Sequence, residues 1–242
     1  MPLTNNLISF WELEEASGTR VDAVTASAND LTDNATVTQN PGKVGQAAQF
    51  TAANSEYLSR ASNASLQAGD IDITFAGWYY MDDKTVNRRM VLKVSLTAGE
   101  REYLVGYRLT PDRLQGLAWK ATDVEVSVNA YALGSPSTAT WYFIVYWHDA
   151  TANTLNIQVN DGTVNSTATA GSLQPATPAE FNVGNSGFGS ATGHHDGRID
   201  QLGFWKRVLN AGERTFLYNS GNGRSYAEIL TESATQDVLY VG

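Results

Sequence analysis

Two short segments carry carboxylates at the spacing that acid–base chemistry uses. In GEREY, Glu100 and Glu102 lie two residues apart, and in DVEVS, Asp123 and Glu125 do the same. Alternate residues of a strand share a face, so each pair could approach the roughly 5 Å separation that retaining glycoside hydrolysis needs. Arg101 stands between the first two acids, and no third acid accompanies the second pair. Glu100 and Glu102 are better interpreted as a solvated pair, and the second pair lacks the third acid, which makes hydrolysis the less favoured chemistry.

The run His194, His195 and Asp196 has the composition of a metal cluster. Adjacent residues of an extended segment point in opposite directions, so the two imidazoles rarely reach one ion. A zinc site would need a third ligand from elsewhere in the chain, such as His148. The flanking glycines favour a loop with polar tips instead.

The aromatic residues could serve sugar binding, in which a flat ring packs on the apolar side of the sugar and polar side chains bind its hydroxyls. The chain has 6 Trp and 11 Tyr. Core packing is the alternative for any of them, and it is the preferred interpretation for Trp78 and Trp205 in their apolar strands. The candidate ligand-binding residues, which could line or flank one concave sheet, are Tyr107, Arg108, Trp119, Trp147, His148 and Asn185.

Charge and composition exclude several classes of protein. The formal net charge of −9 would repel a phosphate backbone, which argues against nucleic acid as a partner. Acidic loops can hold a hard cation, although acidity also simply keeps a protein in solution. The chain has no cysteine, which excludes disulfides, thiolate zinc sites and cysteine nucleophiles.

The ends and apolar runs give expectations about location. The start, MPLTNNLISF, lacks the basic region and the long apolar run of a signal peptide. No apolar stretch is long enough to cross a bilayer, so membrane insertion is not expected. An extracellular or virion-associated protein is expected, with export supplied by something other than a signal peptide of its own.

Alternating patterns predict an all-β chain of short strands. The best examples are DIDITFAGWYYM at 70–81, WYFIVYWHD at 141–149, which is apolar on both faces like a central strand, and TANTLNIQVNDG at 151–162. In the last of these, Asp161-Gly162 supplies a turn. No linker or repeat interrupts this pattern, so residues 1–226 are expected to form one domain, followed by a C-terminal strand or arm at 227–242.

One segment departs from the alternation. The stretch 197–223 begins as a strand and continues as a short helix, for which Asn210 is the predicted cap and Glu213 the capping-box partner. Gly221 and Gly223 are predicted to end this helix. A single helix in this position would cover an open edge or end of a sandwich.

Three segments together resemble the concanavalin A-like jelly rolls, specifically the bacterial and phage laminin-G-like domains. They are LISFWELEEASGTRVDAV, WYFIVYWHDATANTLNIQVNDGT and GRIDQLGFWKRVLNAGERTFLYNSG, and the match runs from about Leu7 to Tyr226. The resemblance implies two stacked antiparallel sheets, one of them concave, and a glycan-binding rather than catalytic role. The laminarinase branch of this superfamily carries Glu-x-Asp-x-Glu on one strand, which this sequence lacks.

The resemblance also implies a calcium ion that joins the loop after the first strand to the final strand. The matching residues are Asp22 and Asp200, with Asn29 or Asp30 as further ligands. The alternative is that Asp22 is a turn residue and Asp200 accepts a bond from the backbone or from Arg198. The prediction is therefore a non-catalytic carbohydrate-binding module with a structural calcium. The alternative function is a structural or adhesive component of a phage virion or surface assembly, which contacts protein or other copies of itself.

Overall fold

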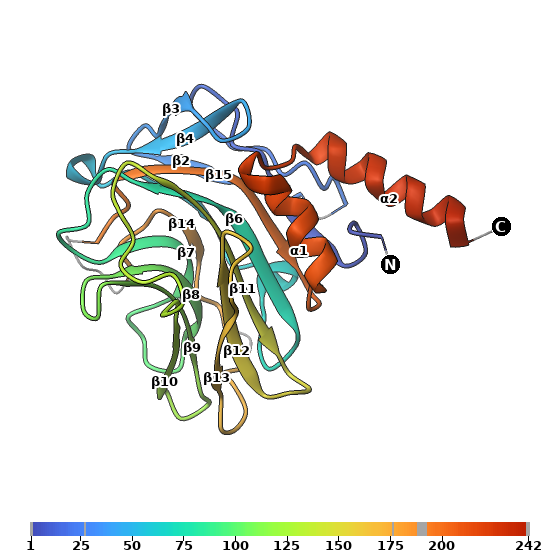
Figure 1. The fold of residues 1–242 in the computed structure, drawn as a ribbon. Helices are drawn as coiled ribbons and strands as arrows, with labels where there is room; N and C mark the ends of the chain where they lie inside the picture. The colour runs from blue at the N-terminus through green and yellow to red at the C-terminus, as the bar shows by residue number, and fades with distance from the viewer. Residues whose placement is uncertain (1, 27, 176, 188–192, 241–242) are drawn as a thin grey trace.

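The computed structural model describes residues 2–26, 28–175, 177–187 and 193–240, with side chains described through residue 235. Two antiparallel sheets stack face to face, which confirms the predicted all-β jelly-roll class (Figure 1). The eight-stranded sheet has the order β13-β12-β11-β6-β15-β4-β3, and β1 pairs with β15. Its strands are β1 (Leu7–Trp11), β3 (Thr38–Pro41), β4 (Gln46–Phe50), β6 (Ile73–Met81), β11 (Trp141–Asp149), β12 (Thr154–Val159), β13 (Asn165–Ala168) and β15 (Gly197–Trp205).

The seven-stranded sheet has the order β10-β9-β8-β7-β14-β5-β2. Its strands are β2 (Thr32–Asn34), β5 (Tyr57–Arg60), β7 (Arg88–Val94), β8 (Arg101–Arg108), β9 (Arg113–Trp119), β10 (Glu125–Asn129) and β14 (Phe181–Val183). The α-helices are α1 (Ala211–Tyr218) and α2 (Tyr226–Tyr240), and the short 3-10 turns are η1 (Ala52–Asn54), η2 (Ala64–Leu66) and η3 (Asn219–Gly221).

The core lies between the sheets because each strand turns alternate side chains toward the other sheet. On β8, Tyr103 and Tyr107 belong to the main core cluster, whereas Leu104 belongs to a separate cluster on the other side of the sheet. Phe75 of β6 stacks on Phe204 of β15 with ring centroids 4.4 Å apart. The alternation therefore assigns every residue of the central strands either to the core or to an outer face.

The outer face of the eight-stranded sheet is covered by α1, the start of α2 and the N-terminal residues (Figure 1). Trp78 stacks on Tyr218 of α1 with ring centroids 5.8 Å apart. The indole of Trp205 donates to the carbonyl of Leu3 at 2.8 Å. Both tryptophans are buried, which confirms the core interpretation of each.

Helix α1 begins as its sequence predicts. The side chain of Asn210 accepts from the Glu213 amide, and the Glu213 side chain accepts from the Asn210 amide, which completes a capping box. The helix ends before the predicted glycines, because Asn219 adopts the left-handed conformation with φ 49° and caps it there.

Helix α2 replaces the strand that was one expectation for the C-terminal residues, and it extends away from the sandwich (Figure 1). At its start, the Ser225 amide donates to the Glu228 carboxylate and the Glu228 amide donates to the Ser225 hydroxyl. No glycine or proline interrupts the helix. Ile229 is buried, and the Ser233 hydroxyl accepts from the Thr4 amide, so the first turns belong to the folded body. Among the described residues, no helix is long and apolar enough to span a membrane.

Candidate functional site

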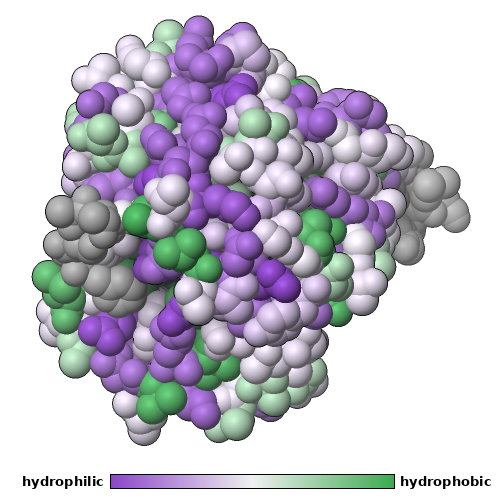
Figure 2. All heavy atoms as spheres, turned by 60° about the vertical axis from the view of Figure 1, so that its left-hand side comes forward, coloured by the Kyte–Doolittle hydropathy of each residue, from purple (hydrophilic) through white to green (hydrophobic). Residues whose placement is uncertain are grey.

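The outer face of the seven-stranded sheet has neither helix over it, and Figure 2 brings this side of the molecule forward. The visible surface is mostly hydrophilic, with small separate hydrophobic areas. On the sheet itself, an apolar patch crosses three adjacent strands, β7, β8 and β9, where Leu92 pairs with Leu104 and Leu104 with Leu117. The patch consists of Leu92, Val94, Leu104, Leu117 and Trp119, and all five side chains are buried, at most 7% exposed.

A row of polar residues runs beside this patch across four strands. Asn129 of β10 pairs with Gln115 of β9, Gln115 with Gly106 of β8, and Gly106 with Arg89 of β7. A Cβ atom on Gly106 would lie 2.3 Å from the carbonyl oxygen of Arg88, so the strand requires glycine there. No side chain therefore stands between Arg89 and Gln115. We call Arg89, Gln115 and Asn129 the polar row.

The polar row holds hydrogen-bonding groups that the described residues leave unused. Gln115 is 1% exposed, and both its Nε2 and its Oε1 lack a partner among the described residues. The Nε of Arg89 and the Oδ1 of Asn129 are likewise buried without a partner there. Buried polar groups are normally paired, so three unpaired groups in one row mark a place where water or a ligand binds.

An ion pair between β8 and β10 spans the polar row and indicates that this face is concave. Arg108 donates to Glu125 at 2.9 Å, and both side chains are about two-fifths exposed, at 40% and 41%. Their partners on β9 are Arg113 and Trp119, which an extended strand separates by roughly 20 Å. The two side chains meet across that span because the sheet bends toward its outer face.

The rim of this face adds aromatic and amide groups. The Arg113 guanidinium lies over the ring of Tyr131, 5.6 Å from its centroid, and Tyr131 is exposed. At the other side, Asn185 donates to Asn182 of β14 at 2.9 Å. Asn182 pairs with Leu92 and therefore lies on the same face as the apolar patch.

The structure brings three of the six predicted ligand-binding residues to this face, namely Arg108, Trp119 and Asn185. Trp119 is only 3% exposed, so its ring packs within the apolar patch and does not form an exposed platform for a sugar. The sequence reasoning missed Arg89, Gln115 and Asn129. The alternation of VEVSVN and of the start of RLQGLAW contained the signal for Asn129 and Gln115, because it places these polar residues on the face opposite the core residues Val128 and Leu114.

The other three predicted residues lie elsewhere, and their assignment to a shared concave sheet was wrong. Tyr107 alternates with Arg108, so its ring enters the core, where its hydroxyl donates to Asp112 at 2.7 Å. Trp147 belongs to the other sheet. Its ring centroid lies 4.5 Å from the guanidinium carbon of Arg214 in α1. His148 is buried at the end of β11, where Nδ1 is 2.9 Å from the carbonyl oxygen of Ile71.

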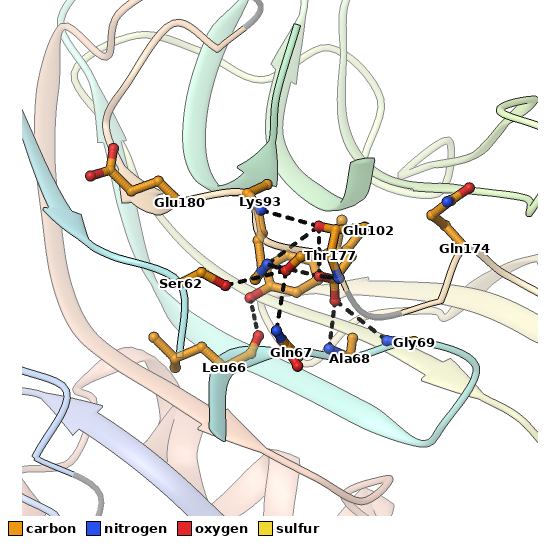
Figure 3. A network of polar contacts seen from close by, with 12 residues as sticks. Ser62, Leu66, Gln67, Ala68, Gly69, Lys93, Glu102, Gln174, Thr177 and Glu180 are labelled. Atoms are coloured by element: carbon orange, nitrogen blue, oxygen red, sulfur yellow. Dashed lines mark hydrogen bonds and ion pairs between the residues drawn. The ribbon is translucent and has the colours of Figure 1, made fainter. Parts of the chain in front are cut away.

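Lys93 and Glu102 form a buried ion pair beneath the same sheet (Figure 3). Their closest atoms are 2.8 Å apart, and both side chains are almost fully buried. Glu102 also accepts from the amides of Ala68 and Thr177, at 2.6 and 2.8 Å, while Lys93 donates to the Thr177 carbonyl at 2.6 Å. This network fastens two connecting segments, around residues 68 and 177, to β7 and β8.

Neither pair of acids forms a free catalytic pair. Glu102 is committed to Lys93, so the interpretation of this acid as a solvated charge was wrong. Asp123 pairs with Arg101 at 3.1 Å, and Glu125 pairs with Arg108. Three of the four candidate acids, Glu102, Asp123 and Glu125, therefore neutralise a neighbouring cation rather than facing a second carboxyl group.

The three histidines, His148, His194 and His195, are buried, so they do not form the polar loop tips expected of them. His195 is fully buried and stacks on Tyr79, with ring centroids 4.5 Å apart. Burial lowers the pKa of His195 to about 3, which keeps it neutral. His148 pairs with Ile73, at the opposite end of β6 from Tyr79, so the three imidazoles do not converge. Among the described residues, no group of three His, Asp or Glu side chains could hold a metal ion.

The two carboxylates predicted to bind calcium, those of Asp22 and Asp200, accept hydrogen bonds from backbone amides in the structure. The Asp22 carboxylate accepts from the amides of Phe10, Val24 and Asn29 at 3.0, 3.0 and 3.1 Å. Asp200 accepts from the amides of two residues in another segment, Lys43 and Val44.

The remaining candidate ligands for calcium are also engaged. The Asn29 side chain donates to Ser9 and Ser65, and Asp30 accepts from the Asp22 amide. These residues do not fit a shared calcium site, and calcium binding by the protein stays a prediction.

Two stacked antiparallel sheets, one with a helix-covered back and one with a concave outer face, define the class of lectin-type jelly rolls. The family model of the concanavalin A-like lectin/glucanase superfamily, Laminin_G_3, matches residues 51–213. The chain therefore belongs to this superfamily, as the resemblance predicts. No curated protein matches the sequence.

Solved structures share the fold at low sequence identity. The binding domain of Paraclostridial Mosquitocidal Protein 1 superposes with a TM-score of 0.70 at 14% identity, over 90% of this chain and 53% of that one. This chain thus spans about half the length of that relative. Domain 4 of AbnA, a GH43 extracellular arabinanase from Geobacillus stearothermophilus solved with arabinotriose, gives 0.63 at 13% identity, over 90% of this chain and 98% of that domain.

A third similar structure is the ligand-binding domain of botulinum neurotoxin serotype D, solved with N-acetylneuraminic acid. Its TM-score is 0.65 at 8% identity, over 90% of this chain and 52% of that one. At these identities the similarity establishes the fold alone.

Proposed function

We propose that this protein is a non-catalytic carbohydrate-binding module whose ligand binds the concave outer face of the seven-stranded sheet. The observation that carries the proposal is Gln115, which is buried on that face with both polar atoms unpaired among the described residues. Leaving such groups unpaired costs about 1–3 kcal/mol each. A ligand that supplies both a donor and an acceptor removes this cost.

Sugar hydroxyls have the matching chemistry, because each one donates and accepts hydrogen bonds. Gln115 and Asn129 offer amides, and Arg89 offers donors alone. The engagement of Glu102, Asp123 and Glu125 in ion pairs supports a binding role over hydrolysis. The arabinotriose and N-acetylneuraminic acid bound to the similar structures agree with a glycan as the ligand.

The Gln115→Leu variant tests this proposal, because leucine keeps the volume and removes both polar atoms. We expect a folded protein with unchanged or slightly raised Tm, whose affinity for the glycan falls about 10- to 100-fold. The ligand is first identified on a glycan array with the wild-type protein, and affinities are then measured by calorimetry.

Gln39→Leu is the matched control, since Gln39 is exposed on edge strand β3 of the other sheet. Its affinity should equal that of the wild type. A folded wild-type protein that binds no glycan, or a Gln115→Leu variant that binds normally, would contradict the proposed site.

Calcium is proposed to have no part in this recognition. Among the described outer-face residues of β7 to β10, the carboxylate beside the polar row is that of Glu125, and Arg108 already binds it. The array should therefore give the same pattern in calcium and in chelator. Loss of binding in chelator would revive a calcium-dependent mode. We further propose that the module works outside the cell, where its glycan ligands are displayed.

A second candidate function is an assembly module of a virion or surface structure. Helix α2 favours it, because this helix extends from the sandwich and exposes Leu230, which is 45% accessible. Light scattering of the wild type and of Leu230→Ser measures the oligomeric state. A symmetric oligomer that Leu230→Ser dissociates would favour assembly. A monomeric wild type would exclude self-assembly of the isolated chain.

A further inference from the structure

Arg89 is an arginine that the protein itself does not neutralise. Its Nε is buried without a hydrogen-bond partner, and no described carboxylate lies within ion-pair distance of its guanidinium. Burial lowers the pKa of Arg89, an effect that Tyr79 and Glu125 partly oppose and that the nearby Arg108 charge reinforces. By contrast, Arg207 and Arg214 on the other side of the molecule each bond to a side-chain oxygen, on Glu213 and Gln158.

The surroundings of Arg89 are positive in a protein that is negative overall. Among the described residues of β7 to β10, the charged side chains on the outer face at the polar row are those of Arg89, Arg108, Arg113 and Glu125. Three cations against one anion leave two positive charges there, whereas the whole chain carries −9. Glu125 is already bound to Arg108 at 2.9 Å, so it compensates Arg108 rather than Arg89.

Resting on the proposed function, we propose that the glycan carries a carboxylate, as a uronic or sialic acid does, and that Arg89 binds it. A guanidinium presents a planar fork of donors that matches a carboxylate with two parallel hydrogen bonds. Gln115 lies two strands away across Gly106, at about 10 Å by strand spacing, with no side chain between them. A sugar ring over Gly106 thus reaches Gln115 with its hydroxyls while its carboxylate meets Arg89.

Matched ligand pairs test the charge separately from the sugar. Trigalacturonic acid is compared with its methyl ester, and sialyllactose with lactose, by calorimetry at low and physiological salt. We expect one acidic ligand to bind at least 10-fold more tightly than its neutral counterpart, and this preference to shrink as salt screens the charge. The pair that responds tells uronic from sialic acid.

Three variants locate the effect. Arg89→Gln should remove the preference, lowering acidic-ligand affinity about 10- to 100-fold while neutral-ligand affinity changes less than about threefold. Arg89→Lys should retain part of the preference, because an ammonium keeps the charge without the fork. Arg198→Gln is the control: Arg198 lies on the other sheet, 3.8 Å from the Tyr80 ring centroid, and its loss removes an equal charge.

The outcomes separate the two proposals. Equal binding of acidic and neutral ligands, unaffected by Arg89→Gln, overturns the carboxylate inference and leaves the glycan-binding face standing. Arg89→Gln weakening both ligands equally also overturns it, because the residue would then bind a hydroxyl. Failure of the folded wild-type protein to bind any member of either pair or of the array refutes the proposed function itself.

Discussion

Replacing Lys93 by methionine will lower the free energy of unfolding by about 3–5 kcal/mol, because it leaves a buried carboxylate without its cation. Glu102 and Lys93 are almost fully buried, with their closest atoms 2.8 Å apart. The reverse change, Glu102→Leu, should cost at least as much, since it also removes the acceptor for the amides of Ala68 and Thr177.

The double variant distinguishes an ion pair from two independent packing losses. Lys93→Met with Glu102→Leu leaves no uncompensated charge, so its loss of stability should be smaller than the sum of the single losses by about 2 kcal/mol. Urea unfolding of the four proteins measures this coupling. Lys120→Met, a partly exposed lysine at the end of the same sheet, is the control and should lose less than about 1 kcal/mol. Strict additivity of the two single losses would refute the pairing.

The stability of the protein will depend on pH through Asp200. Burial raises the pKa of Asp200 to about 7, which Glu14 reinforces and the amides of Lys43 and Val44 oppose. The folded state therefore holds this proton more tightly than the unfolded state, whose carboxyl has an ordinary pKa near 3.8. The stability it contributes is complete below the unfolded pKa and is lost as the pH rises through 7, by roughly 3 kcal/mol between pH 4 and 7.

Asp200→Asn isolates this contribution, because asparagine does not titrate and its oxygen can still accept from both amides. We expect the stability of the wild type relative to Asp200→Asn to fall steadily from pH 4 to 7, measured by urea unfolding at half-unit steps. Asp30→Asn is the control, since the Asp30 carboxylate also accepts from a backbone amide but lies in a half-buried position. Parallel pH profiles for the wild type and Asp200→Asn would show that Asp200 is ionised throughout.

The sequence by itself determined the elements that depend on interactions within a short segment, namely strands, a turn and a helix start. The period of two in 154–159 specified β12, and the continuous apolar run in 141–149 specified the central strand β11. The turn after β12 also lies where Asp161-Gly162 predicts it, although the left-handed residues are Asn160 and Asp161. Asn210 and Glu213 specified the start of α1, since a capping box satisfies amides within one turn of chain. In α2, the same kind of signal at Ser225 and Glu228 was present but overlooked.

Only the tertiary structure decided which side of each strand faces the core. Alternation says that Tyr107 and Arg108 point opposite ways, but the packing of the second sheet decided that the tyrosine is the buried one. It also put Trp119 and Trp147 on different sheets. The polar row depends on pairings between residues of successive strands, such as Arg89 with Gly106 and Gln115 with Asn129. Such register is fixed by the pairing of whole strands, which residue types within one strand do not encode.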